Sequence, residues 1–247
     1  MSVSKLHKFN DTSYSLPDRI TTLINALSLE EKVNQLQHET AAIERLNIPA
    51  YNWWNECLHG VARAGEATVF PQAIGLASTW DRALIYKVAS VISDEARAKY
   101  YKAQMNQECG IYQGLTFWTP NINILRDPRW GRSQETYGED PFLTSEMGVS
   151  FVQGLQGDDP DYFKVVATPK HFAAHSGPEE GRHAWNTVLS IQDLEETYFP
   201  AFRRCVHVGA GSVMGAYNRL NGEPCCASPW LLEDVLRKNW GFKGYVV

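Results

Sequence analysis

The sequence has few cysteines, no long apolar run and no stretch of positive charge. Its 5 cysteines are an odd number spread through 247 residues, which argues against a disulfide framework and a paired metal knuckle. The longest uncharged stretch, Cys109 to Leu125, is interrupted by glycine, proline and asparagine and does not predict a membrane span. The 23 Lys and Arg face 28 Asp and Glu, and no basic run could neutralise a row of phosphates. We expect no membrane and no nucleic acid as partners.

Several short motifs are also missing. Neither G-x-G-x-x-G nor G-x-x-x-x-G-K-[ST] occurs, which argues against a nucleotide-binding open sheet. No G-x-S-x-G marks a serine nucleophile. The first residues, Met1 to Thr12, hold no apolar stretch of the kind that forms an export signal. Together with the odd cysteine count, this predicts a reducing compartment, the cytoplasm.

Aromatic residues are abundant. The chain has 8 Trp, 11 Tyr and 10 Phe, and many of them stand beside polar residues. Aromatic faces next to hydrogen-bonding groups are suited to binding sugars. The 44% hydrophobic and 21% charged content is typical of a folded globular protein. The length also fits one (β/α)8 barrel of about 250 residues.

Hydrophobic periodicity predicts alternating strands and helices. Helices are expected at 28–37, 81–102, 141–155, 193–207 and 229–239, and strands at 115–118, 163–168, 211–217 and 244–247. The helix at 81–102 is expected to carry Leu84, Val88, Val91 and Ile92 on one apolar face. The alternation of strands and helices is typical of a parallel sheet covered by helices. Several predicted strands end in polar residues, as the strands of a TIM-type (β/α)8 barrel do at the active site. We therefore predict such a barrel, within a single domain spanning 1–247, over a doubly wound open sheet.

Three groups of residues have side chains suited to binding. Lys170 and His171 follow an apolar strand, and a cation beside an imidazole can donate hydrogen bonds to vicinal hydroxyls; a partly buried His with a Lys on the rim is the structural alternative. Glu56 lies among aromatics and amides, where it can accept two hydroxyl donors or form an N-cap or buried ion pair. The loop 121–132 holds three arginines, which either fork onto ligand oxygens or form ion pairs from Arg126 to Asp127 and Glu135.

A metal site is a weaker interpretation. His171 and His175 have the i, i+4 spacing of a zinc pair, with His183, Glu179 and Glu180 nearby. The Glu of H-E-x-x-H is absent, and Pro178 ends any helix there. We expect no metal.

These blocks together resemble the N-terminal barrel of glycoside hydrolase family 3, most closely its β-xylosidase and β-glucosidase branch. The blocks occur in order along almost the whole chain: Asn52-Trp53-Trp54-Asn55-Glu56-Cys57-Leu58-His59-Gly60; Asn123-Ile124-Leu125-Arg126-Asp127-Pro128-Arg129-Trp130-Gly131-Arg132 with Glu135 and Gly138-Glu139-Asp140-Pro141; Lys170-His171-Phe172; and Met214-Gly215-Ala216-Tyr217-Asn218-Arg219-Leu220-Asn221-Gly222. The resemblance implies a retaining, exo-acting enzyme with an Asp nucleophile and a Glu acid/base that acts on a sugar or oligosaccharide. It implies no metal or organic cofactor.

The resemblance also assigns roles to individual residues. Arg132, Lys170 and His171 would bind the hydroxyls of the non-reducing sugar, and Glu56 stands in place of the Asp of glucosidases, as in xylosidases. Further matches line the same subsite: Tyr217 beside the nucleophile, Met214, Trp118 as an aromatic wall and, more weakly, Arg182.

Neither catalytic carboxylate is expected within the 247 residues. In the family the nucleophile follows a Gly-Tyr-Val-Val strand within a Ser-Asp dipeptide, and here that strand ends at Val247. The acid/base of this branch belongs to a second α/β domain. We therefore expect a barrel cut after about its seventh strand, inactive alone and prone to self-associate through the open edge.

Two other functions remain open. A non-catalytic sugar-binding relative would keep the pocket without the carboxylates. The β-N-acetylglucosaminidase branch takes its acid/base from a loop after the Lys-His motif, but Gly181 stands where that carboxylate is needed. Glu56 and the Trp-rich block Tyr51 to Trp54 favour a xyloside, but the choice among xylosides, glucosides and arabinosides depends on the shape of the pocket, which the sequence does not define.

Overall fold

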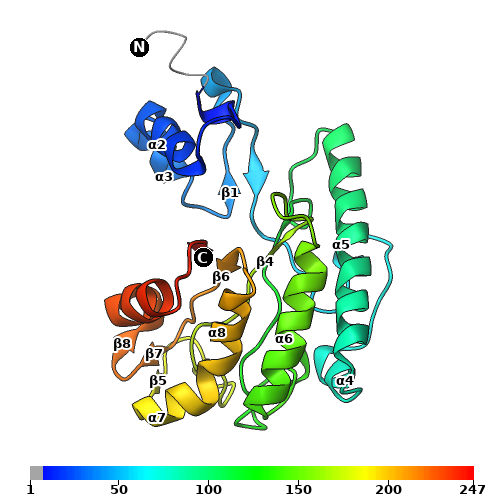
Figure 1. The fold of residues 1–247 in the computed structure, drawn as a ribbon, viewed down its shortest axis with the longest axis vertical. Helices are drawn as coiled ribbons and strands as arrows, with labels where there is room; N and C mark the ends of the chain where they lie inside the picture. The colour runs from blue at the N-terminus through cyan, green and yellow to red at the C-terminus, as the bar shows by residue number, and fades with distance from the viewer. Residues whose placement is uncertain (1–7) are drawn as a thin grey trace.

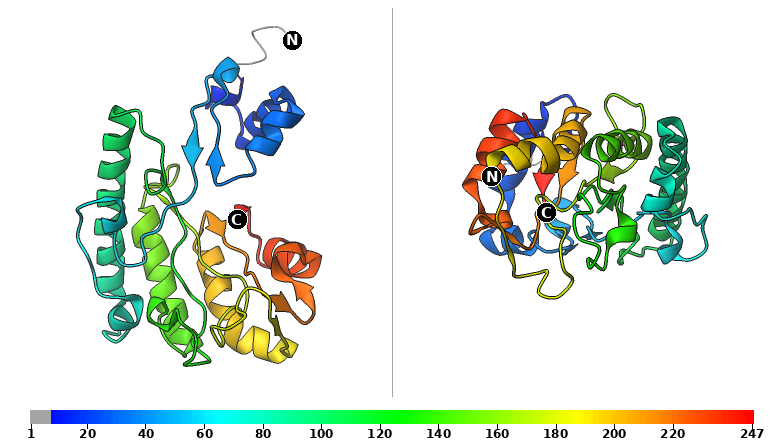
Figure 2. Two further views of the ribbon diagram at one scale, coloured as in Figure 1. Left: turned by 180° about the vertical axis from the view of Figure 1, so that it is seen from behind. Right: turned by 90° about the horizontal axis from the view of Figure 1, so that it is seen from below.

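A computed structural model of the chain describes residues 8–247, in which a row of helices lies beside a ladder of short parallel strands (Figures 1 and 2). The strands of the ladder are β3 (Thr116–Phe117), β4 (Val166–Ala167), β6 (Ser212–Val213) and β9 (Tyr245–Val246). β3 pairs with β4 and β6 pairs with β9, both in parallel. A parallel bridge between Phe172 and Gly215 joins the two pairs, and another between Asn55 and Phe117 extends the ladder at its other side. All four predicted strand regions contain one of these strands.

The ladder is shorter than the near-complete barrel that the sequence predicts. Within residues 8–247 it does not close on itself. Part of the chain instead forms a separate small sheet, with the order β5 (Asn186–Thr187), β7 (Arg219–Leu220) and β8 (Glu223–Pro224). Neither this side sheet nor its β7–β8 hairpin was predicted, because its strands are mostly polar and lie outside the apolar runs that indicate the ladder strands.

Each of the five predicted helical regions contains a helix, and α4 (Ala73–Ala77) is a helix that was not predicted. The other main helices are α5 (Arg82–Met105), α6 (Pro141–Gln156), α7 (Ile191–Asp193), η5 (Leu194–Tyr198), α8 (Pro200–His207) and η7 (Trp230–Asn239). Short turns occupy η1 (Lys8–Asn10), η2 (Glu44–Leu46), η3 (Ala62–Ala64), η4 (Ser133–Glu135) and η6 (Cys225–Ala227). α6 packs between α5 and α8. No helix within residues 8–247 combines the length and apolar character needed to cross a bilayer.

The long helix α5 is oriented by its contact with α6. Asp81 caps it by accepting a hydrogen bond from the Leu84 backbone N–H at 3.0 Å. Its buried face contains Ile85, Val88, Ala89, Ile92 and Ala96. Leu84 and Val91, which the sequence analysis places on that face, are 37% and 43% exposed, so that part of the prediction is wrong. The buried face of α5 is instead the one that packs on α6. The two helices are so close there that a methyl group added to Gly154 of α6 would lie 2.3 Å from the Tyr86 carbonyl oxygen of α5.

Residues before the ladder form a small unit with its own core. α2 (Leu16–Ala26) and α3 (Leu29–Asn34) lie beside an antiparallel pair of β1 (Glu39–Thr40) and β2 (Tyr51–Asn52), in blue in Figure 1. The capping box of Ser28 and Glu31 is confirmed at the start of α3. α2 was not predicted, although Ser15 caps it and Pro17 stands in its first turn, both usual signals of a helix start. Phe9, Ile43 and Leu46 form the buried cluster of this unit.

Most of the core lies between the helices and the ladder. The largest fully buried side chains come mainly from α5, α6, the end of β4 and the α7–α8 region, and include Ile85, Phe151, Phe172, Phe199 and Phe202. Each such side chain contributes roughly 1.5–3 kcal/mol by leaving water. This core packs the ladder against the helices.

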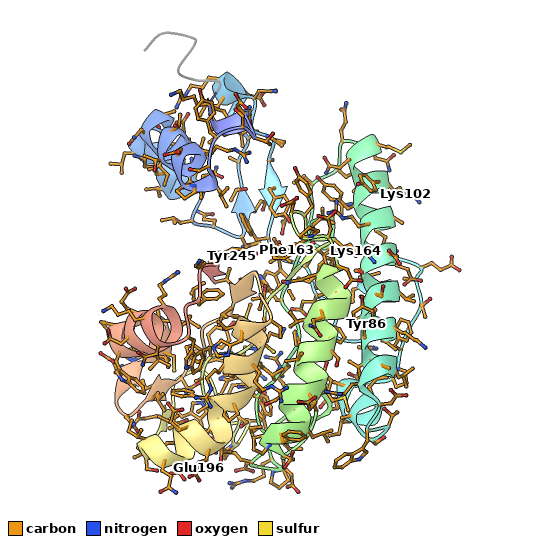
Figure 3. The ribbon with its side chains drawn as sticks, in the orientation of Figure 1. Tyr86, Lys102, Phe163, Lys164, Glu196 and Tyr245 are labelled. Carbon is orange, nitrogen blue, oxygen red and sulfur yellow. The ribbon has the colours of Figure 1, made fainter. Side chains whose placement is uncertain are left out.

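The two ends of the ladder face different parts of the molecule. Phe163 and Lys164, just before β4, and Tyr245, at the start of β9, lie near the N-terminal unit, whereas Glu196 lies at the opposite end (Figure 3). The strands therefore begin near the N-terminal unit, and their carboxyl ends point away from it.

Candidate functional site

The candidate site is built from the segments that follow three neighbouring strands. Residues 118–123 follow β3, 170–175 follow β4 and 214–218 follow β6. Parallel pairing continues beyond the strands, with a bridge from Asn121 to Lys170. Because the carboxyl ends of parallel strands meet at one edge, polar side chains far apart in the sequence come together here.

Arg132 lies at the centre of a hydrogen-bonded group. Its Nε and Nη2 donate to the Glu135 carboxylate at 2.9 and 2.6 Å, and its Nη1 lies 2.9 Å from Nε2 of His171. Asn121 also donates to Glu135, at 3.4 Å. Burial on its own would raise the pKa of Glu135, but the Arg132 hydrogen bonds and charge, with Lys170 and Asn121, outweigh it and hold that pKa below its usual range. The pair is therefore ionised, with the guanidinium fixed in one orientation.

Lys170 is a buried cation. The residue is 2% exposed, and within residues 8–247 its ammonium group forms no ion pair or side-chain hydrogen bond. Burial lowers the pKa of Lys170 to about 8, an effect that the nearby Glu56 charge opposes. A buried ammonium group is costly unless oxygen atoms surround it, so this side chain is suited to receive ligand oxygens.

His171 and His175 stack on each other with ring centroids 4.6 Å apart. Nδ1 of His171 lies 2.8 Å from Oδ1 of Asn123, and Nδ1 of His175 lies 3.1 Å from Oδ1 of Asn218. Burial, followed by the charges of Lys170 and Arg132, lowers the pKa of His171 well below its ordinary value. Burial lowers the pKa of His175 to about 4, despite its hydrogen bond to Asn218. Both rings are therefore neutral at pH 7.

Glu56 lies on an aromatic wall. Its carboxylate accepts hydrogen bonds from Nε1 of Trp54 and Nη1 of Arg63, each at 3.3 Å. The rings of Trp54 and Trp118 lie against each other with centroids 5.1 Å apart. Trp54 is 37% exposed, so its ring is available to a ligand. Glu56 and Arg63 also line a cavity of about 100 Å³ together with His59.

The remaining predicted residues lie around this group. Tyr217 is 62% exposed and stacks on His183, with centroids 4.7 Å apart and the His175 ring at 5.9 Å. Met214 is half-buried, and its carbonyl accepts a hydrogen bond from the Phe172 N–H at 2.7 Å. Arg182 forms an ion pair with Glu179 and donates to His183 at 3.0 Å.

The ion pairs expected in the arginine-rich loop differ from those present. Asp127 pairs with Arg129 rather than with Arg126, and Glu135 pairs with Arg132. The Arg126 guanidinium instead lies over the rings of Trp185 and Tyr198, at 5.7 and 5.3 Å. Local spacing favours Arg129 because its Nε and Nη2 both reach the Asp127 carboxylate.

The histidines do not form a metal cluster. Among residues 8–247, no three His, Cys, Asp or Glu side chains are grouped so that they could hold an ion. Both ring nitrogens of His171 are engaged, and Glu179 accepts from the Gly131 backbone N–H at 2.9 Å as well as pairing with Arg182.

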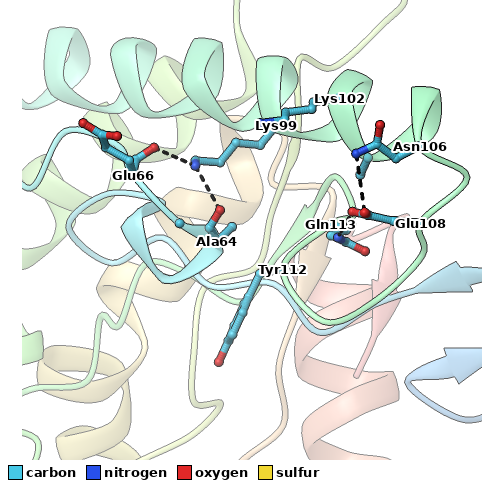
Figure 4. Close-up of a pocket in the computed structure, with 10 residues that line it drawn as sticks. Ala64, Glu66, Lys99, Lys102, Asn106, Glu108, Tyr112 and Gln113 are labelled. Carbon is cyan, nitrogen blue, oxygen red and sulfur yellow. Dashed lines mark hydrogen bonds between the residues drawn. The ribbon is translucent and has the colours of Figure 1, made fainter.

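A separate cavity of about 600 Å³ lies beside the carboxyl-terminal part of α5 (Figure 4). Lys102, Glu108 and Tyr112 are among its lining residues. Lys99 does not offer its charge there, because its ammonium donates to the carbonyls of Ala64 and Glu66 at 3.0 and 2.8 Å. Residues 108–113 precede β3, so this cavity lies away from the carboxyl ends of the strands.

Sequence reasoning named the central residues but missed those that support them. Asn121, Asn123 and Asn218 each follow a strand and hold a neighbouring charged or imidazole group. A buried amide at the end of a strand is the sequence signal that could have identified them, because such a group needs polar partners.

Comparison with known proteins identifies the family. The family model for the glycosyl hydrolase family 3 N terminal domain matches residues 19–247. The chain is 47% identical over 244 residues to a xylan 1,4-beta-xylosidase of Xylanibacter ruminicola, covering 97% of this chain and 28% of that protein. It is 43% identical to a probable beta-D-xylosidase 7 of Arabidopsis thaliana, covering 98% of this chain and 34% of that protein.

Solved structures give the same result. A GH3 exo-beta-xylosidase in complex with a xylobiose aziridine activity-based probe matches with a TM-score of 0.86 and 34% identity, over 96% of this chain and 32% of the other. A beta-glucosidase 3B from Thermotoga neapolitana in complex with alpha-D-glucose matches with a TM-score of 0.77 and 33% identity, over 92% and 33%. The chain thus spans about a third of the length of these relatives. It belongs to glycosyl hydrolase family 3 and corresponds to the N-terminal domain of that family.

Proposed function

We propose that this chain forms the sugar-binding pocket of a retaining, exo-acting β-glycosidase of the xylosidase and glucosidase type, which acts in the breakdown of plant polysaccharide. The observation that carries the proposal is the buried, unpaired ammonium of Lys170 beside the fixed guanidinium of Arg132. A buried ammonium at the end of β4 and a fixed guanidinium close to it match the hydroxyl oxygens of a monosaccharide, and the family's β-xylosidases are similar to this chain over nearly its whole length.

Each side chain has a part in holding the sugar. Lys170 and Arg132 donate to hydroxyl oxygens, while the Glu56 carboxylate accepts from hydroxyl groups at the outer end of the sugar. The faces of Trp54 and Trp118 pack against the C–H side of the ring. Tyr217 steadies the nucleophile carboxylate, and Met214 and Arg182 complete the wall. Glu56 favours a xyloside over a glucoside.

Hydrolysis requires two catalytic carboxylates, and we assign neither of them to a residue of the pocket described here. A retaining glycosidase uses a nucleophile, which attacks the anomeric carbon, and an acid/base, which protonates the leaving oxygen. We propose that the nucleophile follows Val247 and that the acid/base comes from a second domain. Since loss of a nucleophile lowers the rate by orders of magnitude, the 247-residue chain alone binds sugar without hydrolysing it.

The test is hydrolysis by the product of the complete reading frame. Aryl β-D-xylosides and aryl β-D-glucosides are assayed with that protein and with its Lys170→Met variant. The proposal predicts hydrolysis, faster for the xyloside, and a fall of at least tenfold in the variant. A reading frame that stops at Val247, with saturable sugar binding by the chain, would instead favour a non-catalytic sugar-binding protein.

A further inference from the structure

The amide of Asn123 has one possible orientation. Its Nδ2 donates to the backbone carbonyl of His171 at 2.9 Å, and its Oδ1 accepts from the backbone N–H of His171 at 2.9 Å. A backbone carbonyl only accepts and a backbone N–H only donates, so the oxygen and nitrogen of this amide cannot be exchanged. Oδ1 therefore faces Nδ1 of His171, at 2.8 Å.

This orientation determines the protonation of the His171 ring. Because Oδ1 of Asn123 can only accept, Nδ1 of His171 must carry a proton. On the other side of the ring, Nη1 of Arg132 can only donate, so Nε2 of His171 must accept at 2.9 Å. His171 is then a neutral ring with its proton on Nδ1. The charged and titratable groups around it, Lys170, Arg132, His175 and Arg182, all oppose a second proton.

The neutral ring holds Arg132 in place. Three bonds, to His171 Nε2 and to both oxygens of Glu135, fix the guanidinium from two sides. Within residues 8–247 its remaining N–H groups have no hydrogen-bond partner, so they can meet a ligand. If Nε2 of His171 carried a proton, it would face the Arg132 N–H groups donor to donor, and this arrangement would be lost.

We propose that Asn123 is a positioning residue of the sugar site, which fixes His171 as the Nδ1–H tautomer so that Nε2 aligns Arg132 toward a sugar hydroxyl. The inference rests on the proposed function only for the identity of the ligand. His171 is therefore not a hydrogen-bond donor to the sugar through Nε2, because that nitrogen is an acceptor in this arrangement.

A second pair has the same geometry. Nδ2 of Asn218 donates to the carbonyls of Ala173 and Arg219, at 3.3 and 3.1 Å, so its Oδ1 faces Nδ1 of His175. His175 is therefore also expected with its proton on Nδ1. Its Nε2 is buried and has no hydrogen-bond partner within residues 8–247.

The tautomers are measured in long-range ¹H–¹⁵N correlation spectra of the labelled 247-residue chain at pH 7. We expect His171 and His175 to show protonated Nδ1 and unprotonated Nε2. Finding His171 with its proton on Nε2 would overturn the proposal. This readout needs no sugar and no activity, so it stands whether or not the proposed function holds.

Variants then test the positioning. Asn123→Asp places a carboxylate against Nδ1, so we expect both ring nitrogens of His171 to be protonated at pH 6 and the affinity for D-xylose to fall at least tenfold. Asn221→Asp is the matched control, because Asn221 bonds the backbone N–H and carbonyl of Leu189, at 2.9 and 3.0 Å, with no imidazole involved. The control should leave His171 and xylose affinity unchanged.

The outcomes are separable. An equal loss of affinity in both variants would show a general structural effect and contradict the positioning role. If Asn123→Asp does not fold, the tautomer of His171 in the unmodified chain decides the proposal. If D-xylose does not bind the unmodified chain while His171 has the expected tautomer, the proposed function fails and the tautomer assignment holds.

Discussion

Lys170 combines burial with an unused positive charge, and this gives it opposite effects on binding and on stability. Its pKa of about 8 lies below the ordinary value of 10.5, so between these values the unfolded chain binds more protons than the folded one. Stability from this residue therefore rises with pH across that range, by roughly 3 kcal/mol in total. Sugar affinity should fall over the same range, because the ammonium donor is lost.

Comparison with the Lys170→Met variant separates the pH dependence of stability and of sugar affinity that is due to Lys170 from that of other groups that titrate at alkaline pH. Relative to this variant, we expect the unmodified chain to gain stability between pH 8 and pH 10 in urea unfolding, while its D-xylose affinity falls. Equal pH slopes for the two proteins would contradict the assignment of a buried, protonated Lys170.

Glu56 supports the same charge. Since the Glu56 carboxylate raises the pKa of Lys170 against the effect of burial, Glu56→Gln should lower that pKa below about 8. The alkaline fall in xylose affinity should then begin at lower pH, measured by calorimetry across a pH series. Lys99→Gln serves as a distant control, because the Lys99 ammonium donates to the carbonyls of Ala64 and Glu66 and lies away from this site, and it should leave the profile unchanged.

At this scale the sequence identified the charged residues better than their partners. Lys170, His171, Arg132 and Glu56 follow from motifs that stand out along the chain. The amides that orient them do not, because a hydrogen bond between Asn123 and His171 joins residues that only the parallel pairing of β3 and β4 brings together.

Among the elements, α5 and α6 show what close packing requires. Gly154 of α6 faces Tyr86 of α5 so closely that a methyl group would lie 2.3 Å from the Tyr86 carbonyl oxygen. Gly154→Ala should therefore destabilise the chain by about 1–3 kcal/mol through overpacking. Gly75→Ala in α4 is the matched control, since its methyl group would meet its nearest neighbour, Pro71, at an ordinary 3.7 Å.

Urea unfolding of the two variants measures the difference. Gly75→Ala should leave stability unchanged or raise it by up to about 1 kcal/mol, because alanine restricts the unfolded chain and favours a helix. A Gly154→Ala variant as stable as Gly75→Ala would contradict the close packing of α5 and α6 at Gly154.

Helices with a capping residue and a long apolar stripe were predictable, as were the ladder strands that lie in apolar runs, whereas the polar strands of the side sheet were not. Asp81 and Asp140 mark the starts of α5 and α6 in the sequence itself. The side sheet β5–β7–β8 depends on pairing between Asn186 and Arg219, which no local pattern encodes. The prediction for the buried face of α5 was partly wrong because hydrophobic periodicity locates an apolar stripe on a helix but does not show which part of that stripe a neighbouring element covers.

For the molecule as a whole, the open ladder has a consequence for association. Val247 forms hydrogen bonds with the β6 segment through both its N–H and its carbonyl. Because backbone groups alternate in direction along a strand, the N–H and carbonyl of Val246 face the other side of β9. Within residues 8–247 no strand pairs with that side. We therefore propose that the chain self-associates there, as unpaired edges do.

Sedimentation velocity over a range of concentrations tests this. The unmodified chain should form larger species as its concentration rises, and Val246→Pro, which removes the outward N–H without touching the bonds of Val247, should reduce them. A monodisperse monomer at every concentration would contradict the proposal, as would association unaffected by Val246→Pro.

We propose above all that a monosaccharide binds at the carboxyl ends of β3, β4 and β6. The most direct test of this binding is a titration of the labelled 247-residue chain with D-xylose, followed by ¹H–¹⁵N spectra, with Lys170→Met and Lys102→Met as paired variants. We expect saturable shifts centred on Arg132, Lys170 and His171, lost in Lys170→Met and kept in Lys102→Met. Shifts centred on Tyr112 and the cavity of Figure 4, or no saturable shifts at high millimolar xylose, would contradict the proposal.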